Sequence, residues 1–384
     1  MLTRYELKLP KAVYSGENVM ENLTKIVKGL KKVALFTDKS LLQFGLADGA
    51  IAAIKAAGAE VEIFSDLKAE PTYEQVQAVV DAYRKSQAEM IVGLGGGSVI
   101  DATKLTSLLA GCDVTVKQLL DNPLAAKRHV PTVMIPSTAG TGAEASPIGV
   151  VAVPEKELKV GIVNPDMIPD TVILDANLIK NLPRKIAAAT GLDALAHAVE
   201  CYTSKKANPF SDTFALEALD IIINNLEKAV DDPNAFEQKT KMFIAAFYAG
   251  IALTASGVTG VHALSYPLGG KYHIAHGVSN AILLVPVMKF NEPVIRGRLA
   301  QAYDRVCHDE KKLTTDQEKS AWMIAKMDSM VKHLDIPTSL KEFGVKDEDI
   351  DGLVSAGMEV TRLLVNNMRE ITPEAARSIY LEIM

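Results

Sequence analysis

Two short segments of this 384-residue chain place an aspartate and several histidines at spacings that suit a metal ion. Asp193 and His197 are four residues apart, so on a helix they share one face. Their neighbours Ala194, Ala196 and Ala198 are small and apolar. An ionisable pair in such surroundings is costly to bury unless something pairs it, which favours a ligand at this position.

The second segment runs from His262 to His276 and contains Pro267 and a pair of glycines. Proline and glycine break helices, so we expect the chain to fold back here and turn both imidazoles toward one point. One carboxylate and three imidazoles suit Fe²⁺ or Zn²⁺ better than Mg²⁺ or Ca²⁺, and both ions stay open. A single histidine is more often structural, but the joint pattern predicts a metal site.

The remaining histidines have a different sequence context. His129, His308 and His333 adjoin charged residues or amphipathic helices and are predicted to lie on the surface. His273, three residues before His276, could donate or relay a proton at a cleft, or could be structural.

A glycine-rich loop joins a predicted strand to a predicted helix. Gly95, Gly96 and Gly97 precede Ser98 at this junction. Close backbone approach and the unpaired amides of a helix N-terminus suit a pyrophosphate, so the loop predicts dinucleotide binding. The spacing matches neither GxGxxG nor a P-loop, and a tight turn with Ser98 as the N-cap is the alternative interpretation.

Two other strand ends carry polar groups. Asp38 follows the first predicted strand, where a carboxylate could bind the ribose of NAD and repel the 2′-phosphate of NADP, or simply cap the next helix. The stretch from Pro136 to Glu144 is rich in small hydroxyl residues. It could line a nicotinamide pocket or form a polar turn.

The elements that would position these residues fall into two halves. In the first half, β-branched runs alternate with helical patterns at Ala47–Ala57 and Tyr73–Lys85, which predicts a doubly wound, mainly parallel sheet. The expected strands are Lys32–Thr37, Val61–Ser65, Met90–Gly95, Thr132–Pro136, Gly149–Val153 and Thr171–Asp175.

After Pro183 the apolar residues recur every three or four positions, which predicts an all-helical half. The expected helices are Ile186–Cys201, Ser211–Val230, Ala235–Ala255, Asp316–His333 and Pro373–Met384. We therefore predict an α/β domain over residues 1–181 and an all-helical domain over residues 182–384, packed around a shared cleft.

The composition favours small-molecule partners. A net charge of −6 leaves no basic surface for nucleic acid or an acidic membrane. Cys112, Cys201 and Cys307 are odd in number and widely spaced, which fits a reducing cytoplasm rather than disulfides. The N-terminus lacks a signal-peptide pattern, and the longest apolar run, Ala281–Met288, is too short to span a bilayer, so a soluble, unexported protein is expected.

Taken together, the motifs resemble those of the iron-containing (group III) alcohol dehydrogenases. They are Gly95-Gly96-Gly97-Ser98-x-x-Asp101-x-x-Lys104, Pro136-Ser137-Thr138-Ala139-Gly140-Thr141-Gly142-x-Glu144, Gly191-x-Asp193-x-x-x-His197 and His262-x13-His276. They occur in order across nearly the whole chain. The resemblance implies an N-terminal Rossmann-like dinucleotide-binding domain and a C-terminal helical bundle, as in dehydroquinate synthase-like folds.

The resemblance also implies a role for individual residues. Asp193, His197, His262 and His276 would be the metal ligands. The residues implied to bind the cofactor are Asp38 at the ribose, Gly95, Gly96, Gly97, Ser98 and Asp101 in and after the pyrophosphate loop, Thr138 and Thr141 in the hydroxyl-rich turn, and Lys159 at a ribose. One departure is Tyr266, where several relatives have histidine, which leaves all four ligands intact but should alter the substrate pocket or proton path.

The implied reaction is NAD(H)-linked interconversion of a small alcohol and its aldehyde or ketone, with Fe²⁺ or Zn²⁺ as the Lewis acid on the substrate oxygen. His273 is our own candidate for passing the proton to solvent, through water or a ribose hydroxyl. Alternatives are a relative of glycerol dehydrogenase or dehydroquinate synthase, or a non-catalytic nucleotide-binding protein. Ethanol, propanediols, lactaldehyde and small acidic semialdehydes all stay open as substrates. By family habit, a homodimer or larger homo-oligomer is expected.

Overall fold

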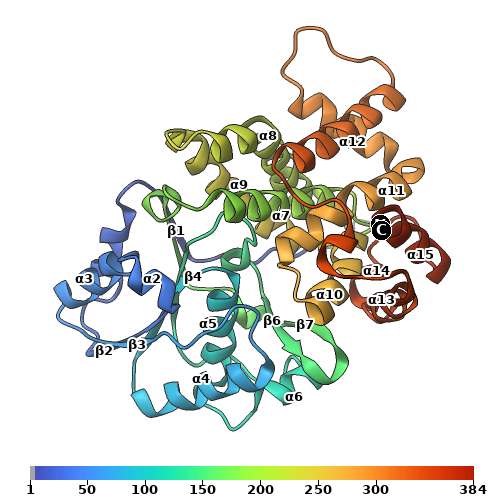
Figure 1. Ribbon diagram of the computed structural model, residues 1–384. Coiled ribbons are helices and arrows are strands. Elements are labelled where there is room, and N and C mark those ends of the chain that lie inside the picture. Colours follow the sequence, from blue (N-terminus) through green and yellow to red (C-terminus); the bar gives the residue numbers. More distant parts are fainter. Residues whose placement is uncertain (1–4) are drawn as a thin grey trace.

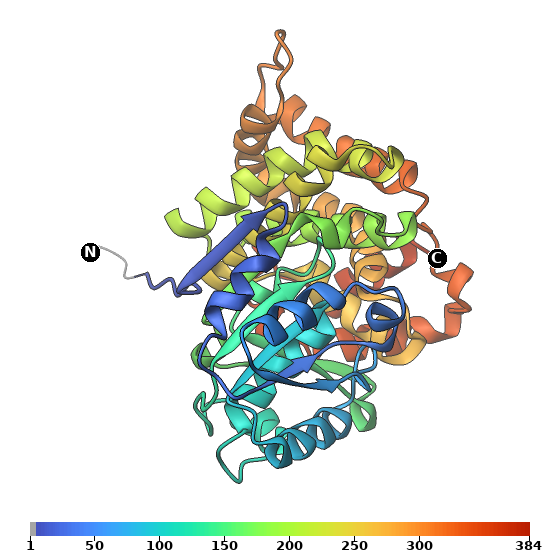
Figure 2. The same cartoon turned by 90° about the vertical axis from the view of Figure 1, so that its left-hand side faces the viewer.

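The computed structural model describes residues 5–384, and its first half is built on a six-stranded, all-parallel sheet. In spatial order the strands are β1 (Ala12–Gly16), β8 (Thr171–Asp175), β5 (Thr132–Pro136), β4 (Met90–Gly95), β2 (Lys32–Phe36) and β3 (Glu60–Phe64). Every residue of β4 and β5 is buried, as expected for central strands with both faces covered. Figure 2 shows β1 along the outside of this half.

Helices cover both faces of the sheet. They are α1 (Asn22–Ile26), α2 (Lys39–Gln43), α3 (Asp48–Ala56), α4 (Tyr73–Ser86), α5 (Gly97–Leu109) and α6 (Val116–Asp121). The apolar residues of α1 and α3 share one core with the sheet, whereas those of α4, α5 and α6 share another. This confirms the doubly wound arrangement predicted from the alternating pattern.

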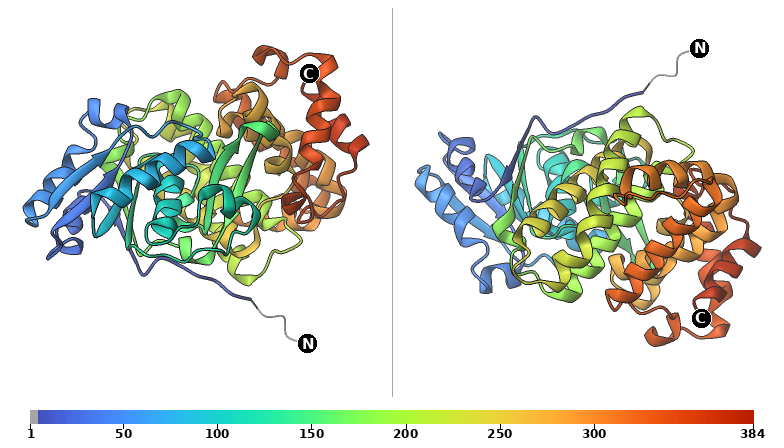
Figure 3. Two further views of the ribbon diagram at one scale, coloured as in Figure 1. Left: turned by 90° about the horizontal axis from the view of Figure 1, so that it is seen from below. Right: turned by 90° about the horizontal axis from the view of Figure 1, so that it is seen from above.

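A separate antiparallel hairpin, β6 (Ile148–Val153) with β7 (Leu158–Val163), lies against α5 and α10. The predicted strand at Gly149–Val153 therefore exists, but its placement in the parallel sheet was wrong. Its burial alternates along the strand, which is typical of a hairpin with one covered face. In Figure 3 the green hairpin lies between the blue sheet half and the red C-terminal helices.

The second half is helical from Arg184 onward in the residues that the structure describes (Figure 1). Its helices are α7 (Arg184–Tyr202), α8 (Pro209–Asp231), α9 (Phe236–Ser256), α10 (Gly260–Tyr272), α11 (His276–Val306), α12 (Asp316–His333), α13 (Ile350–Met358), α14 (Thr361–Leu364) and α15 (Pro373–Glu382). Within residues 5–384 no single helix has the length and apolar composition to cross a bilayer, and α9 with α10 meets that test only as a pair bent by 107°.

The region from His262 to His276 departs from the predicted break. Helix α10 continues through Pro267. In the turn that precedes this proline, the Tyr380 hydroxyl donates a hydrogen bond to the Leu264 carbonyl at 2.6 Å. The glycine pair serves packing, since a Cβ on Gly269 would lie 2.5 Å from Lys159 Nζ. The chain reverses only at His273, whose φ of 55° ends α10 before α11 begins at His276.

The two halves meet closely beside the hydroxyl-rich turn. A Cβ on Gly142 would lie 2.6 Å from the Ala246 carbonyl oxygen in α9, and the φ of Gly142 is 57°. Only glycine satisfies both the conformation and the contact. The turn that follows β5 is therefore locked against the helical half.

Candidate metal and cofactor site

Helix α7 carries three ionisable side chains along one face. Asp193, His197 and Glu200 are spaced four and then three residues apart, and they are 1%, 4% and 0% exposed. The alanines between them let the helix approach its neighbours closely. Three charged or polar groups at this depth require partners, which come from α10 and α11.

The partners are His262 in the first turn of α10 and His276 at the start of α11. Asp193 Oδ1 lies 3.7 Å from His262 Nε2 and 3.8 Å from His276 Nε2. One oxygen or nitrogen from each of the three residues lies within 4.8 Å of the others. The structure thus brings together three of the four predicted ligands around one point.

His197, the fourth, lies beside this group with a different ring orientation. Its Nε2 is 3.1 Å from His262 Nε2, and its Nδ1 is 3.9 Å from Asp193 Oδ1. That Nδ1 is buried and has no hydrogen-bond partner among the described residues. Desolvation lowers the pKa of His197 to about 4 and that of His276 to about 3, so both imidazoles are neutral and offer lone pairs at pH 7.

This donor set fits a divalent ion. A buried carboxylate among neutral imidazoles, with one imidazole nitrogen unpartnered, matches the oxygen and nitrogen preference of Fe²⁺ and Zn²⁺. Burial opposes ionisation of Asp193, but the histidines, which carry positive charge only when they are protonated at low pH, and the hydrogen bond from Asn280 outweigh it and lower its pKa. The carboxylate therefore stays charged and available to a cation.

Glu200 was not predicted, although it contacts the imidazole of the candidate ligand His262. Its Oε2 contacts His262 Nδ1, and its Oε1 accepts hydrogen bonds from Thr259 N at 3.0 Å and from Val261 N at 2.8 Å. A proton held on Nδ1 leaves Nε2 free to face the metal point. The available sequence signal was its place on the Asp193 and His197 face of α7.

Asn280, one turn after His276 on α11, is a second residue that the sequence did not single out. Its Nδ2 donates to Asp193 Oδ1 at 2.7 Å and lies 3.0 Å from His262 Nε2 and 3.2 Å from His276 Nε2. The amide therefore contacts three of the candidate ligand atoms. Its Oδ1 is buried without a hydrogen-bond partner among the described residues.

A cleft of about 960 Å³, partly open to solvent, connects this centre to the glycine loop. Both halves of the chain line it. The lining includes His197, His262, Tyr266 and His276 from the helical half, and Gly97, Ser98, Thr141 and Lys159 from the sheet half. The metal point and the candidate cofactor loop thus share one cleft, as predicted for a two-domain arrangement.

The glycine loop forms the N-terminus of α5. Gly96, not Ser98, is the N-cap, and Ser98 Oγ accepts a hydrogen bond from Glu70 N at 3.0 Å, so the interpretation of Ser98 as a cap was wrong. A Cβ on Gly95 would lie 2.6 Å from Val99, which ties this glycine to helix packing. Gly96 is partly exposed, and a Cβ there would make only ordinary van der Waals contact, so this residue leaves the helix N-terminus accessible.

The hydroxyl-rich turn lies beside this loop. A Cβ on Gly96 would be 3.9 Å from Thr138 Cγ2, and one on Gly97 would be 2.9 Å from Thr141 Cγ2. Both threonines are partly exposed. The loop after β4 and the turn after β5 therefore form one continuous surface at the carboxyl edge of the sheet, where open α/β sheets bind their ligands.

Asp38 caps α2, since its Oδ1 accepts a hydrogen bond from Leu41 N at 3.0 Å. The capping role is thus observed, and a ribose contact stays a prediction.

Asp101 lies 2.9 Å from Lys104 Nζ and accepts a hydrogen bond from Val150 N at 3.1 Å. It therefore holds α5 against the hairpin while it lines the cleft.

Comparison with known proteins shows to which family this chain belongs. The model for "Iron-containing alcohol dehydrogenase" matches residues 10–176, and the model for "Fe-containing alcohol dehydrogenase family, C-terminal" matches residues 187–384. The chain belongs to the iron-containing alcohol dehydrogenase family. It is therefore an NAD(P)-dependent oxidoreductase of alcohols and aldehydes with an Asp/His metal site.

Individual relatives of this iron-containing alcohol dehydrogenase cover its whole length. "Long-chain-alcohol dehydrogenase 1" of Geobacillus thermodenitrificans is 33% identical over 97% of this chain and 94% of the relative. A crystal structure of 1,3-propanediol oxidoreductase superposes with a TM-score of 0.92 at 28% identity, covering 100% of both chains. Sulfoacetaldehyde reductase from Bifidobacterium kashiwanohense, in complex with NAD⁺, gives 0.88 at 26% identity over 99% of both chains.

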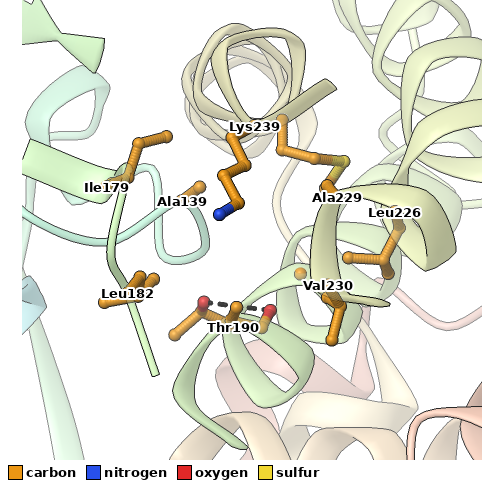
Figure 4. A pocket seen from close by; sticks show the side chains of 11 residues that line it. Ala139, Ile179, Leu182, Thr190, Leu226, Ala229, Val230 and Lys239 are labelled. Carbon is orange, nitrogen blue, oxygen red and sulfur yellow. Dashed lines mark hydrogen bonds between the residues drawn. The ribbon is translucent and has the colours of Figure 1, made fainter. Parts of the chain in front are cut away.

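Two other features of this dehydrogenase lie apart from its cleft. His273 is exposed at the turn between α10 and α11, and it is not one of the described residues that line the cleft. A smaller, mainly apolar pocket lies between α7, α8 and α9 (Figure 4). The ammonium of Lys239 in that pocket donates to the carbonyls of Lys180 and Pro233, and no described acid or histidine lines it.

Proposed function

We propose that this chain is a metal-dependent, NAD(H)-linked dehydrogenase that interconverts a small primary or secondary alcohol and its aldehyde or ketone. The observation that carries the proposal is the convergence of Asp193, His262 and His276 in the cleft that also contains the glycine loop. We propose Fe²⁺ as the ion, with Zn²⁺ as the alternative. His197 completes the ligand set in this proposal.

When bound, the ion would supply a Lewis acid for the substrate oxygen, and the nicotinamide would supply the donor or acceptor of the hydride. The protein contributes orientation and charge. Asp193 provides the negative charge of the ligand set, and Glu200 holds His262 with Nε2 toward the metal point. Reduction also consumes one proton at the oxygen, which exposed His273 could exchange with solvent.

Residues at the sheet edge support the cofactor proposal. Gly96, Gly97 and Ser98 would hold the pyrophosphate at the N-terminus of α5, flanked by Thr138 and Thr141. The carboxylate of Asp38 at the end of β2 supports a preference for NAD over NADP. Lys159 also lines the cleft, with its Nζ 2.5 Å from Glu70 Oε1, and we propose that it contacts a ribose.

A cyclase of the dehydroquinate synthase type is the weaker alternative, because such a pocket needs several cations for a phosphate. Within the described cleft lining, Arg362 is the single arginine and Lys159 is already paired with Glu70. The named substrates of the relatives range from long-chain alcohols to 1,3-propanediol and sulfoacetaldehyde, so family membership does not identify the alcohol on which this chain acts.

We also propose that the protein is a homo-oligomer in a reducing cytoplasm, in keeping with its three unpaired cysteines.

The test is an activity panel of short alcohols and aldehydes with NADH and NADPH, using protein reconstituted separately with Fe²⁺ and Zn²⁺. His262→Ala should abolish turnover and metal content while leaving NADH binding largely intact. Full activity in metal-free protein would contradict the proposal. A cyclase would instead give no steady change in NADH absorbance with any alcohol or aldehyde.

A further inference from the structure

We infer that the cleft takes an aldehyde or alcohol with an anionic group at the end away from the reacting carbon, and that Arg362 binds that anion. The anion would be a carboxylate, sulfonate or phosphonate. This inference rests on the proposed dehydrogenase function and specifies its substrate class. Its basis is the position of Arg362 in the cleft lining, where none of the described residues 5–384 pairs with its charge.

Arg362 lies on α14 and lines the same cleft as His262 and His276. Its guanidinium lies against β7 at Gly161, where a Cβ would come within 2.8 Å of Nη2. Any larger residue at position 161 would push the guanidinium away. Glycine on the hairpin therefore makes room for an arginine that comes from the other half of the chain.

The other two cations beside the cleft are neutralised by the protein itself. Lys104 Nζ is fully buried, lies 2.9 Å from Asp101 Oδ1 and donates to the Ala143 carbonyl at 2.9 Å. Lys159 Nζ lies 2.5 Å from Glu70 Oε1. Both lysines therefore have a carboxylate partner, and both acids that line the cleft are used by these pairs.

Arg362 differs from both lysines. Among residues 5–384, no carboxylate forms an ion pair with its guanidinium, and no group accepts a hydrogen bond from it. Arg362 is exposed to solvent and forms part of the cleft lining. An unpaired guanidinium binds carboxylates and related oxyanions through two parallel hydrogen bonds, which gives both affinity and orientation.

Tyr266 connects the arginine to the metal centre. Its ring is 6% exposed and its centroid lies 6.2 Å from that of His276. Tyr266 and Arg362 both line the cleft, and their helices α10 and α14 pack against each other. In this inference the substrate extends from the metal point, past Tyr266, to Arg362 along the one cleft that all of them line.

The test compares aldehydes of two to five carbons that carry a terminal carboxylate, sulfonate or phosphonate with neutral aldehydes of equal length. Succinic semialdehyde and butanal, each with four carbons, form one such pair. We expect wild-type kcat/KM to favour the anionic member, and Arg362→Gln to lower it roughly 10- to 100-fold for that member, as expected for a charge-assisted hydrogen bond. For the neutral member the change should stay below about threefold, and Arg362→Lys should recover part of the loss.

Arg377→Gln is the matched control, because Arg377 pairs with Asp351 on the surface outside the cleft lining. NADH fluorescence titration distinguishes this inference from a second explanation, in which Arg362 binds the cofactor and not the substrate. If Arg362→Gln weakens NADH binding and slows both aldehydes equally, the arginine serves the cofactor and the inference is wrong. A wild-type preference for neutral aldehydes also overturns it while leaving the dehydrogenase function intact, whereas inactivity with every aldehyde counts against that function.

Discussion

Glu200 Oε2 on α7 contacts His262 Nδ1 on α10, so one helix sets the ring orientation of a metal-ligand candidate on another. The same carboxylate accepts hydrogen bonds from the backbone amides of Thr259 and Val261 at the start of α10. One side chain thus joins the N-terminus of a helix to the chemistry of the site.

Glu200→Gln should lower metal affinity about 10- to 100-fold, as is typical when a partner of a metal-bound histidine is lost. The amide can donate to Nδ1, which would move the imidazole proton to Nε2 and block the ligand atom. Competition with a chelator under anaerobic Fe²⁺ or Zn²⁺ measures the affinity directly. Glu217→Gln, on the surface of α8 beside Arg305, is the control. Equal metal affinities in the wild type, Glu200→Gln and Glu217→Gln would refute the positioning role of Glu200.

Asn280→Ala should destabilise the metal-free protein more than the metal-loaded one. Without an ion, the Asn280 amide is the group that donates to the buried Asp193 carboxylate, at 2.7 Å. Its loss leaves that carboxylate short of a donor, which costs about 1–3 kcal/mol. Urea unfolding with a chelator and with saturating metal measures the two values, and Asn225→Ala on α8 is the control. The same loss in both states would mean that Asn280 matters only for packing.

Much of the fold could be predicted because the central strands are continuous apolar runs bounded by turns. Met90–Gly95 and Thr132–Pro136 were predicted with the bounds that the structure gives. β1 and β7 were missed, since Ala12–Gly16 is an edge strand and Leu158–Val163 contains a lysine and a glycine. Neither pattern stands out from a loop without knowledge of the pairing partner.

The site could be predicted only where the residue type is itself unusual. A histidine pair with an aspartate in an alanine-rich helix is rare, whereas Glu200 and Asn280 are common residues on helices and acquire meaning only from contacts across helices. The predicted break at Pro267 failed for a related reason. The glycines that follow Pro267 pack α10 against the hairpin, which is a tertiary contact that local rules cannot anticipate.

Asp38→Asn should raise the kcat/KM for NADPH relative to that for NADH by roughly tenfold, because the carboxylate that would repel a 2′-phosphate is removed. Asparagine also accepts the hydrogen bond from Leu41 N, so the cap of α2 is kept. Kinetics with both cofactors measure the ratio. Asp48→Asn in the first turn of α3 is the control for net charge. An unchanged ratio would limit Asp38 to capping.

His273→Asn tests the proton-exchange proposal. Asparagine tolerates the left-handed conformation at φ 55°, so the turn before His276 should persist while the titratable group is lost. We expect kcat to fall several-fold, metal content to stay unchanged, and added imidazole buffer to restore part of the rate. His308→Asn, an exposed histidine paired with Asp220, is the control. A normal rate and pH profile in His273→Asn would assign this residue to the turn alone.

Glu144→Gln should make stability less dependent on pH. Glu144 is 2% exposed, and desolvation raises its pKa from 4.5 to about 7 in the folded protein. An acid whose folded pKa is raised favours the folded state below its unfolded pKa, and this contribution is lost as the pH rises from about 4.5 to about 7.

The wild-type protein should therefore lose up to about 3 kcal/mol of unfolding free energy between pH 4.5 and 8 from this one group, whereas glutamine, which cannot ionise, should not. Urea unfolding of both proteins at pH 5 and pH 8 measures the difference. Glu237→Gln, an exposed residue paired with Lys241, is the control and should follow the wild-type curve closely. Parallel pH dependences in the wild type and Glu144→Gln would show that Glu144 ionises as readily in the folded chain as in the unfolded one.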